Sequence, residues 1–388
     1  MNISVLEVAV NNAINTMKIL SGLHRLFKIP LLLCLLLFLA IFGCSGGGSD
    51  LDITGNDNPT PIEVKLVHGT LLVVKAVAND SIPLDMLVDT GSSRTHVPSE
   101  IFGNPNGEVY ISSLCLENGL CFNNFMAQSS NSAFTQNKDG YFNGIIGVDL
   151  LKNFNVTFDY KNELIYFYDT LENDSSGMKT ISFQYQSSRP YANVSIEDQP
   201  QGTNLLDTGA AYTRITFSIL DTLNQEPEVL FESVVFNFNS SEVVDYVSLV
   251  DYCVGVACPG EIIVQIGSWP AVGGTFFREY LTIFRFSQNV LKLDRYNDKS
   301  HIKKSGIHRM GLQINIYDAS EIIYVVEDGF AWSGGLREGD EIISVNGIPI
   351  DSLGYFGIYE LLADTSIEEY QFLFITPAGD VKDVTISL

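Results

Sequence analysis

The sequence predicts a mainly β protein in which a large duplicated domain is followed by a small α+β domain. Three observations support this fold class: short strand patterns alternate with turns, one apolar-Asp-Thr-Gly segment occurs twice, and the composition changes just before residue 300. The chain has 388 residues, enough for two or three domains. We expect the following organisation: an N-terminal address at 1–43, a tether at 44–60, a β domain at 61–298 with halves of about 61–175 and 176–298, and a C-terminal domain with a short linker at 299–388.

The first segment has the pattern of an export signal. Basic residues precede an uncharged apolar run from Ile29 to Gly43, and Cys44 follows it. A membrane-spanning helix needs about 20 apolar residues, so this shorter run has the length of a signal-peptide core. The segment resembles a bacterial lipobox, which implies that residues 1–43 are removed and that Cys44 carries a lipid. A short buried helix followed by a flexible loop is the alternative.

Two further residues refine this expectation. Met17 lies just before the basic residues and is a plausible true start of the chain. Ser45 after the cysteine resembles a sorting signal for the outer membrane. We therefore expect a lipid-anchored protein of the bacterial cell envelope, on the outer membrane and facing the periplasm or the cell surface.

The charge of the chain excludes some partners. The formal net charge is -24 at pH 7. Binding to nucleic acid or to an anionic lipid surface needs clustered Lys and Arg. We expect no nucleic-acid partner, and membrane attachment through the lipid anchor only.

Four cysteines of the mature chain form two close pairs in sequence, Cys115 with Cys121 and Cys253 with Cys258. An exported protein can keep such pairs oxidised. A zinc site is the alternative for four cysteines, but the two spacings do not match a pair of zinc knuckles. We expect two disulfides, each closing a short loop and worth about 2 kcal/mol.

Strand patterns dominate the β domain. Thr70 to Val77 is rich in β-branched residues, and the segments 155–160 and 164–168 flank a turn at Lys161 to Glu163 and predict a hairpin. No long helical period occurs before about residue 300.

The repeat carries the functional argument. Leu87 to Ser93 (LVDTGSS) recurs as Leu205 to Ala211 (LLDTGAA). An apolar-apolar-Gly segment follows each copy at a similar distance: it ends at Gly147 in the first half and at Gly273 in the second.

The match continues beyond these glycines. In each half a bulky apolar residue lies three positions after the glycine, and an aromatic residue lies eleven positions after it: Leu150 and Phe158, then Phe276 and Phe284. A single Asp-Thr-Gly would be weak evidence, but the two copies with their matching surroundings indicate a duplicated unit.

This repeat resembles the pepsin and retropepsin aspartic proteases over roughly residues 61–298. The resemblance implies a two-lobed acid-protease β-barrel fold in which Asp89 and Asp207 meet, share one proton and activate water without a metal or a cofactor. Two carboxylates a few ångströms apart cannot both ionise cheaply, which suits this chemistry. The resemblance assigns a supporting role to the rest of both loops: Thr90, Gly91, Ser92, Thr208 and Gly209.

Two finer expectations concern the first half. We expect the Ser92 hydroxyl to bond Asp89, because Ala210 has no equivalent group, and therefore expect Asp89 to be the more acidic member of the pair. We also expect the hairpin turning at 117–119 to be either a substrate flap or a surface hairpin away from the cleft.

The C-terminal domain resembles the PDZ domains of bacterial proteases. Ala331, Gly335-Leu336, Gly339-Asp340, Ile342 and Val345-Asn346-Gly347 carry the resemblance. It implies that backbone N–H groups of Met310, Gly311 and Leu312 bind a peptide carboxylate, and that the peptide adds as a strand to a sheet edge.

The sequence thus predicts an envelope-anchored aspartic endopeptidase that acts on peptide or protein substrates. Its PDZ domain recruits substrates or partners, or gates the site. The alternatives are a non-catalytic peptide-binding lipoprotein and an envelope scaffold built on the PDZ domain.

Overall fold

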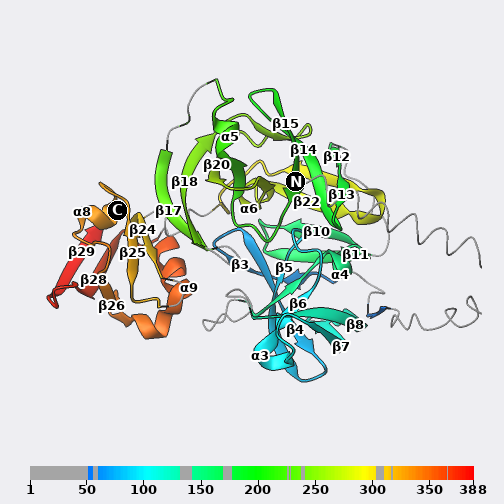
Figure 1. Cartoon of the computed structure of the whole chain (residues 1–388), viewed down its shortest axis with the longest axis horizontal. Coiled ribbons are helices and arrows are strands. Elements are labelled where there is room, and N and C mark those ends of the chain that lie inside the picture. Colours follow the sequence, from blue (N-terminus) through cyan, green and yellow to red (C-terminus); the bar gives the residue numbers. More distant parts are fainter. Residues whose placement is uncertain are drawn as a thin grey trace, which may run out of the picture. The chain divides into compact units, whose positions relative to one another are not determined.

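The computed structural model describes the chain from residue 51 onward with internal gaps. The described residues are 51–55, 60–131, 142–168, 177–224, 227, 229–236, 241–302, 310–315, 318–364 and 366–388. They form a mainly β structure (Figure 1). The expected signal segment and the lipidation site at Cys44 lie outside these residues.

An eight-stranded sheet forms the first half of the β domain, and each half carries one Asp-Thr-Gly loop. Along the sheet the strands are β1 (Asp52–Thr54), β8 (Cys121–Ser130), β6 (His96–Pro98), β9 (Gly144–Ile146), β5 (Ile82–Val88), β4 (Leu71–Ala78) and β3 (Lys65–Val67), with β7 (Glu108–Leu116) paired to β4 and β8. The predicted strand at 70–77 is therefore present as β4. β1 pairs with β8, so residues 52–54 belong to the sheet and not to a free tether as expected.

A nine-stranded sheet forms the second half. Its strands are β13 (Gln184–Gln186), β14 (Arg189–Ile196), β15 (Gln199–Leu206), β21 (Ala271–Val272), β16 (Thr213–Thr216), β20 (Ile262–Gly267), β18 (Ser241–Leu249) and β17 (Val229–Phe236), with β19 (Tyr252–Val254) paired to β14. The strand before each Asp pairs in parallel with the apolar-apolar-Gly strand of its own half: β5 with β9, and β15 with β21.

A six-stranded sheet contains strands from both halves. Its order is β12 (Lys179–Ser182), β23 (Val290–Arg295), β22 (Tyr280–Arg285), β10 (Asn155–Asp159), β11 (Leu164–Tyr168) and β2 (Ile62–Glu63). β10 and β11 form the predicted hairpin. The two halves meet where β10 pairs with β22, and the repeated aromatics Phe158 and Phe284 pack there with ring centroids 5.7 Å apart.

The described helices of the β domain are single turns: α3 (Ser99–Phe102), α4 (Val148–Leu151), α5 (Phe217–Leu220), α6 (Gly274–Phe277) and the 3-10 turn η2 (Phe286–Gln288). α4 and α6 follow the glycine of each apolar-apolar-Gly strand. Leu150 and Phe276, the repeated apolar residues, are buried on these helices. The sequence repeat therefore marks the same structural position twice.

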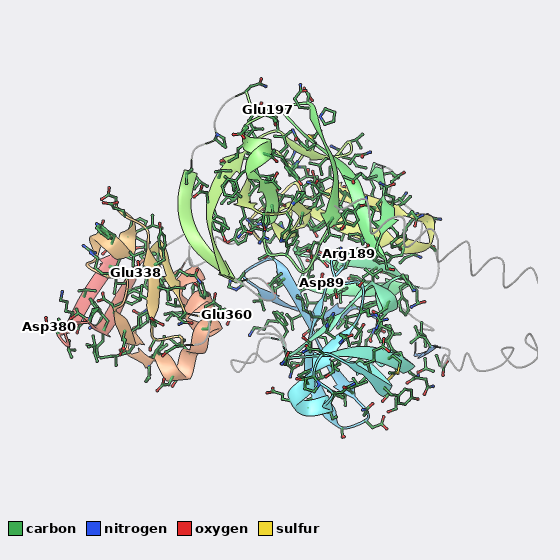
Figure 2. All side chains as sticks on the ribbon, in the orientation of Figure 1. Asp89, Arg189, Glu197, Glu338, Glu360 and Asp380 are labelled. Atoms are coloured by element: carbon green, nitrogen blue, oxygen red, sulfur yellow. A yellow bond between two sulfur atoms is a disulfide. The ribbon has the colours of Figure 1, made fainter. Side chains whose placement is uncertain are left out.

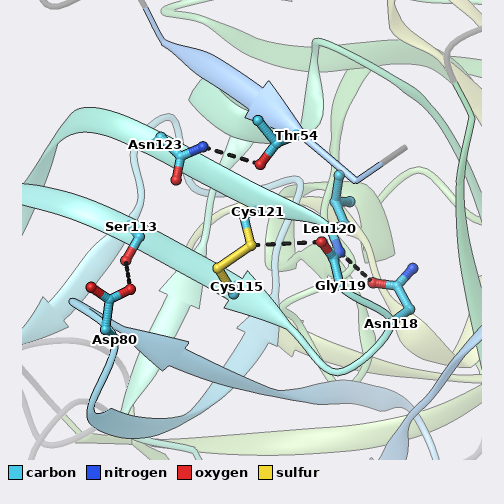
Figure 3. Close-up of a disulfide and its surroundings, with 9 residues drawn as sticks. All are labelled: Thr54, Asp80, Ser113, Cys115, Asn118, Gly119, Leu120, Cys121 and Asn123. Carbon is cyan, nitrogen blue, oxygen red and sulfur yellow. Dashed lines mark hydrogen bonds between the residues drawn. A yellow bond between two sulfur atoms is a disulfide. The ribbon is translucent and has the colours of Figure 1, made fainter. Parts of the chain in front are cut away.

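Both predicted disulfides form, Cys115–Cys121 and Cys253–Cys258. The first closes the β7–β8 hairpin (Figure 3). The turn of this hairpin contacts β1 and Thr60: Thr54 pairs with Cys121, and the Asn118 side-chain amide donates to the Thr60 carbonyl at 2.9 Å. Phe122 beside this turn packs on Phe154 and Phe167, toward the six-stranded sheet. These contacts favour the surface-hairpin alternative over a flap.

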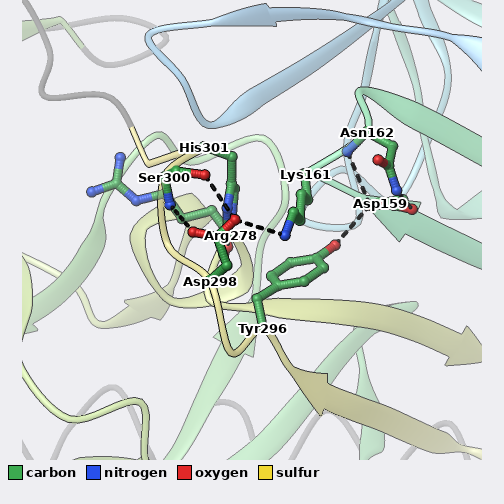
Figure 4. Close-up of polar contacts among 8 residues, drawn as sticks. All are labelled: Asp159, Lys161, Asn162, Arg278, Tyr296, Asp298, Ser300 and His301. Atoms are coloured by element: carbon green, nitrogen blue, oxygen red, sulfur yellow. Dashed lines mark hydrogen bonds and ion pairs between the residues drawn. The ribbon is translucent and has the colours of Figure 1, made fainter.

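The chain leaves the β domain through a pinned segment. The Tyr296 hydroxyl donates to Asp159 at 2.9 Å, and Lys161 pairs with Asp298 at 3.1 Å (Figure 4). The His301 ring bonds the Arg278 carbonyl at 2.9 Å and packs against Tyr296. The start of the predicted linker is thus attached to the domain.

The C-terminal domain is α+β. Its elements are β24 (Leu312–Ile314), β25 (Ile322–Val325), α8 (Phe330–Ser333), β26 (Glu341–Val345), β27 (Ile348–Pro349), α9 (Ile350–Ala363), β28 (Glu369–Ile375) and β29 (Val381–Ser387). Asn346 and Gly347 both have positive φ and turn the chain between β26 and β27, as expected of an Asn-Gly pair. α9 bends at Gly354, where φ is 61°. Among the described residues, no helix has the length and apolar character needed to cross a membrane.

Candidate active site

Each Asp of the repeat lies directly after a buried strand. Val88 and Leu206, the last residues of β5 and β15, are fully buried. Because successive side chains of a strand point to opposite faces, Asp89 and Asp207 point away from that core. Their backbone N–H groups donate to the apolar-apolar-Gly strands, Asp89 to Ile146 O at 3.0 Å and Asp207 to Val272 O at 2.9 Å. The same local structure therefore presents both carboxyl groups.

The two threonines bind each loop to the other half. The Thr90 N–H donates to Thr208 Oγ1 at 3.0 Å, and the Thr208 N–H donates to Thr90 Oγ1 at 3.1 Å. Each hydroxyl in turn donates to the carbonyl before the opposite Asp, Thr90 to Leu206 O at 2.7 Å and Thr208 to Val88 O at 2.8 Å. Both threonines are fully buried, so these four bonds fix the two loops against each other.

The glycines leave room for the opposite carboxyl group. A Cβ atom on Gly91 would overlap the side chain of Asp207, and a Cβ on Gly209 would overlap that of Asp89. The requirement for glycine is steric at both positions, since neither residue has a positive φ. In Figure 2 the Asp89 side chain lies where the blue strands of the first half meet the green strands of the second.

The two carboxyl groups hydrogen-bond to each other. Asp89 Oδ1 accepts from the N–H groups of Gly91 at 2.7 Å and Ser92 at 3.1 Å, and Asp207 Oδ1 accepts from Gly209 at 3.0 Å. Asp207 is 7% exposed, whereas Asp89 is partly exposed. A solvent-accessible acid thus lies directly beside a buried one.

The environment separates the two pKa values. Burial, followed by the charge of Asp89, raises the pKa of Asp207 well above its ordinary value. Burial also raises the pKa of Asp89, but the hydrogen bonds from Asp207 and from the loop N–H groups oppose this. Asp207 is therefore the member of the pair that holds the proton, in the direction expected from the sequence.

The expected reason for this asymmetry was wrong in one detail. The Ser92 hydroxyl donates to the Arg94 carbonyl at 2.7 Å and not to Asp89. Asp89 instead accepts the backbone N–H of Ser92. The contribution of residue 92 to the acidity of Asp89 thus comes from the backbone.

The sequence analysis missed a second layer of support behind each loop. Thr95 and Thr213 occupy the same place after the two aspartates, and their hydroxyls accept from Gly147 N at 3.2 Å and Gly273 N at 3.1 Å. The groups that bond these threonines from α4 and α6 differ. Asp149 accepts both the N–H and the hydroxyl of Thr95, whereas the Thr275 hydroxyl accepts the N–H of Thr213. Asp149 and Thr275 each lie two positions after the repeated glycine of their half, and this shared spacing is the signal that could have revealed them.

The predicted carboxylate-binding residues of the C-terminal domain lie together at the start of β24. Met310 and Leu312 are buried, and Gly311 has φ 68°. The Gly311 carbonyl accepts from Val326 N at 2.8 Å, which ties this loop to the end of β25. The three residues are thus continuous with β24.

The part of the chain that the structure describes holds no group of three or more His, Cys, Asp or Glu side chains placed to bind a metal ion.

Comparison with known proteins identifies the C-terminal domain. A family model described as a PDZ domain matches residues 321–387. No curated protein matches the chain. The chain therefore contains a PDZ domain, which supports a role in binding peptides or proteins. The residues 310–312 precede the matched segment, although β24 pairs with β25 inside it.

Proposed function

We propose that this chain is an aspartic-type endopeptidase with the two-lobed acid-protease fold, and that its PDZ domain recruits substrates or partners. One observation carries the proposal: the carboxyl groups of two repeated loops hydrogen-bond to each other, inside a frame of four reciprocal threonine bonds. A pair of ordinary β-turns has no need of this arrangement. Gly91 and Gly209 add to the argument, because a side chain at either position would overlap the carboxyl group of the opposite Asp.

The proposed mechanism follows from the pKa order. Ionised Asp89 takes a proton from a water molecule, which attacks the carbonyl carbon of the scissile peptide bond. Protonated Asp207 donates a hydrogen bond to the carbonyl oxygen and stabilises the charge that develops on it. The proton on Asp89 then goes to the leaving amine, and the pair returns to its single-proton state. The loop N–H groups that bond Asp89 hold it in position throughout.

The test is hydrolysis of a mixed peptide library by the purified mature chain from acid to neutral pH. The proposal expects internal cleavage that is lost in Asp89→Asn and in Asp207→Asn, while both variants keep the fold by circular dichroism. Cleavage that survives both substitutions would contradict the assignment of the site. Complete absence of cleavage, with peptide binding retained, would contradict the enzyme.

A non-catalytic peptide-binding protein is the second candidate, and the PDZ match favours it. It predicts that peptides bind without turnover and that both Asp→Asn variants bind as well as the wild type. An envelope scaffold is a variant of this candidate in which only the PDZ domain acts.

We also propose that the protein is lipid-anchored in the bacterial envelope through Cys44, with an outer-membrane location. The motif at Ile41 to Ser45 supports this proposal. Incorporation of a palmitate analogue that is lost in Cys44→Ala tests it, and labelling that persists in this variant would contradict it.

A further inference from the structure

Within the part of the chain that the structure describes, β24 of the PDZ domain is an edge strand that pairs with β25. The Gly311 carbonyl and the Asn315 N–H both bond toward β25, to Val326 N at 2.8 Å and Glu321 O at 2.9 Å. Backbone groups of an antiparallel strand alternate in direction, so those of Leu312 and Ile314 point to the opposite edge. A peptide that adds to this edge as a strand must pair with these two residues in turn.

Side chains of the domain itself already bond this edge at Ile314. The Ile314 N–H donates to the Tyr359 hydroxyl at 3.5 Å, and the Ile314 carbonyl accepts from the side-chain amide of Gln313 at 3.2 Å. The same Gln313 amide reaches the Tyr355 hydroxyl at 3.2 Å. Both tyrosines lie on α9 beyond its bend at Gly354, one helical turn apart and therefore on one face.

This arrangement is buried and complete. Ile314 is 0% exposed, Gln313 is 4% and Tyr359 is 5%. No corresponding side-chain bond is recorded for the Leu312 backbone among the described residues. The edge is thus closed by side chains at Ile314, while the loop that precedes it continues directly into Leu312.

We propose that Tyr359 ends the peptide register, so that this PDZ domain reads a free C-terminal carboxylate and the last two residues of its ligand. Residues further upstream pair with Ile314 only by displacing the Tyr359 hydroxyl and the Gln313 amide. That exchanges one set of hydrogen bonds for another and brings little net affinity. The inference depends on the PDZ domain and is independent of the proposed proteolysis.

The experiment compares ligand length in the full mature chain carrying Asp207→Asn, which prevents cleavage. The probes are N-acetyl dipeptides with a free carboxylate and hexapeptide pools that share the same last two residues, with the four preceding positions randomised. Dissociation constants are measured by NMR titration. The wild-type PDZ sequence binds dipeptide and hexapeptide equally. Tyr359→Phe keeps the ring but frees the Ile314 N–H, and binds the hexapeptides roughly threefold to tenfold more tightly with the dipeptides unchanged.

Tyr370→Phe is the matched control, because its buried hydroxyl bonds the carbonyls of Leu361 and Asp364. It changes neither affinity. Tighter binding of hexapeptides than of dipeptides by the wild type overturns the proposal. It is also overturned if Tyr359→Phe binds both probes with equal affinity, or if neither probe binds. Hydrogen exchange gives a second measure: the Ile314 amide exchanges faster in Tyr359→Phe, and an unchanged rate counts against the proposal.

Discussion

The two halves of the β domain build the same loop with different supporting residues. In both halves the Asp N–H bonds the apolar-apolar-Gly strand, the threonine reaches the opposite half, and the glycine faces the opposite carboxyl. The groups behind the loops differ, since the first half uses the carboxylate of Asp149 where the second uses the hydroxyl of Thr275. The comparison indicates that the pair of acids requires the loop bonds that both halves share, whereas the group that supports the loop from behind can differ between the halves.

The largest expected effect breaks the pair itself. Asp89→Asn and Asp207→Asn should each lower peptide hydrolysis by roughly 10²–10⁴-fold, because each removes one partner of general acid–base catalysis.

The two variants should differ in stability. Burial raises the pKa of Asp207, so the folded state retains a proton that the unfolded state releases. The contribution of Asp207 to the free energy of unfolding is then fully present below the ordinary Asp range and is lost as pH rises from that range through the raised pKa.

Asp207→Asn should remove that dependence and raise the melting temperature at neutral pH. Thermal unfolding from pH 3 to pH 8 measures it, on about the range in which carboxyl groups titrate. If the wild type instead gains stability relative to Asp207→Asn as pH rises over this range, the assignment of the proton to Asp207 is contradicted.

The next effect tests the reciprocity of the threonines. Thr90→Val and Thr208→Val keep the shape of the side chain but leave a buried carbonyl and a buried N–H without a partner. Each unpaired group costs about 1–3 kcal/mol, so we expect a loss of about 2–6 kcal/mol in the free energy of unfolding for either variant. Chemical denaturation measures the losses. Markedly unequal values would show that the two halves do not share the frame equally.

A smaller effect exchanges the support of one half for that of the other. Asp149→Ala leaves the N–H and hydroxyl of Thr95 without their acceptor and should cost about 1–3 kcal/mol. Asp149→Thr places in the first half the residue that serves the second, and should recover most of the loss. Denaturation of both variants, with Thr275→Val as the matched change in the other half, tests this. Equal losses for Ala and Thr at position 149 would contradict it.

The smallest effect is at Ser92. Its hydroxyl bonds the Arg94 carbonyl, so Ser92→Ala, which copies Ala210, should leave the acidic limb of the pH–rate profile in place. The backbone N–H that bonds Asp89 is unchanged in this variant. A shift of that limb to higher pH would restore a role for the hydroxyl.

The sequence was most informative where the chemistry is local and repeated. Asp89 and Asp207 were placed as a pair because both end apolar strands in a repeated Asp-Thr-Gly segment, and in the structure the backbone N–H of each bonds the apolar-apolar-Gly strand of its own half. The disulfides and the hairpin of β10 and β11 were also predicted from spacing, and both are confirmed. These features depend on neighbours close along the chain.

Features that depend on distant contacts could not be predicted. The direction of the Ser92 hydroxyl depends on a free rotor and a nearby carbonyl. The position of the Asn118 turn depends on β1, a strand within the expected tether. The closure of β24 by Tyr359 depends on how α9 continues after Gly354, far beyond Ile314 in the chain. No periodicity in the sequence encodes these contacts.

The pairing of β10 with β22 has a consequence for the origin of the duplicated domain. A single ancestral half would leave the outer backbone groups of its β10 equivalent open to water, with the aromatic ring beside them uncovered. An open edge of this kind invites a second copy to pair with it. Fusion of two such copies into one polypeptide would make the association permanent and independent of concentration, and would allow the two partners to acquire separate roles.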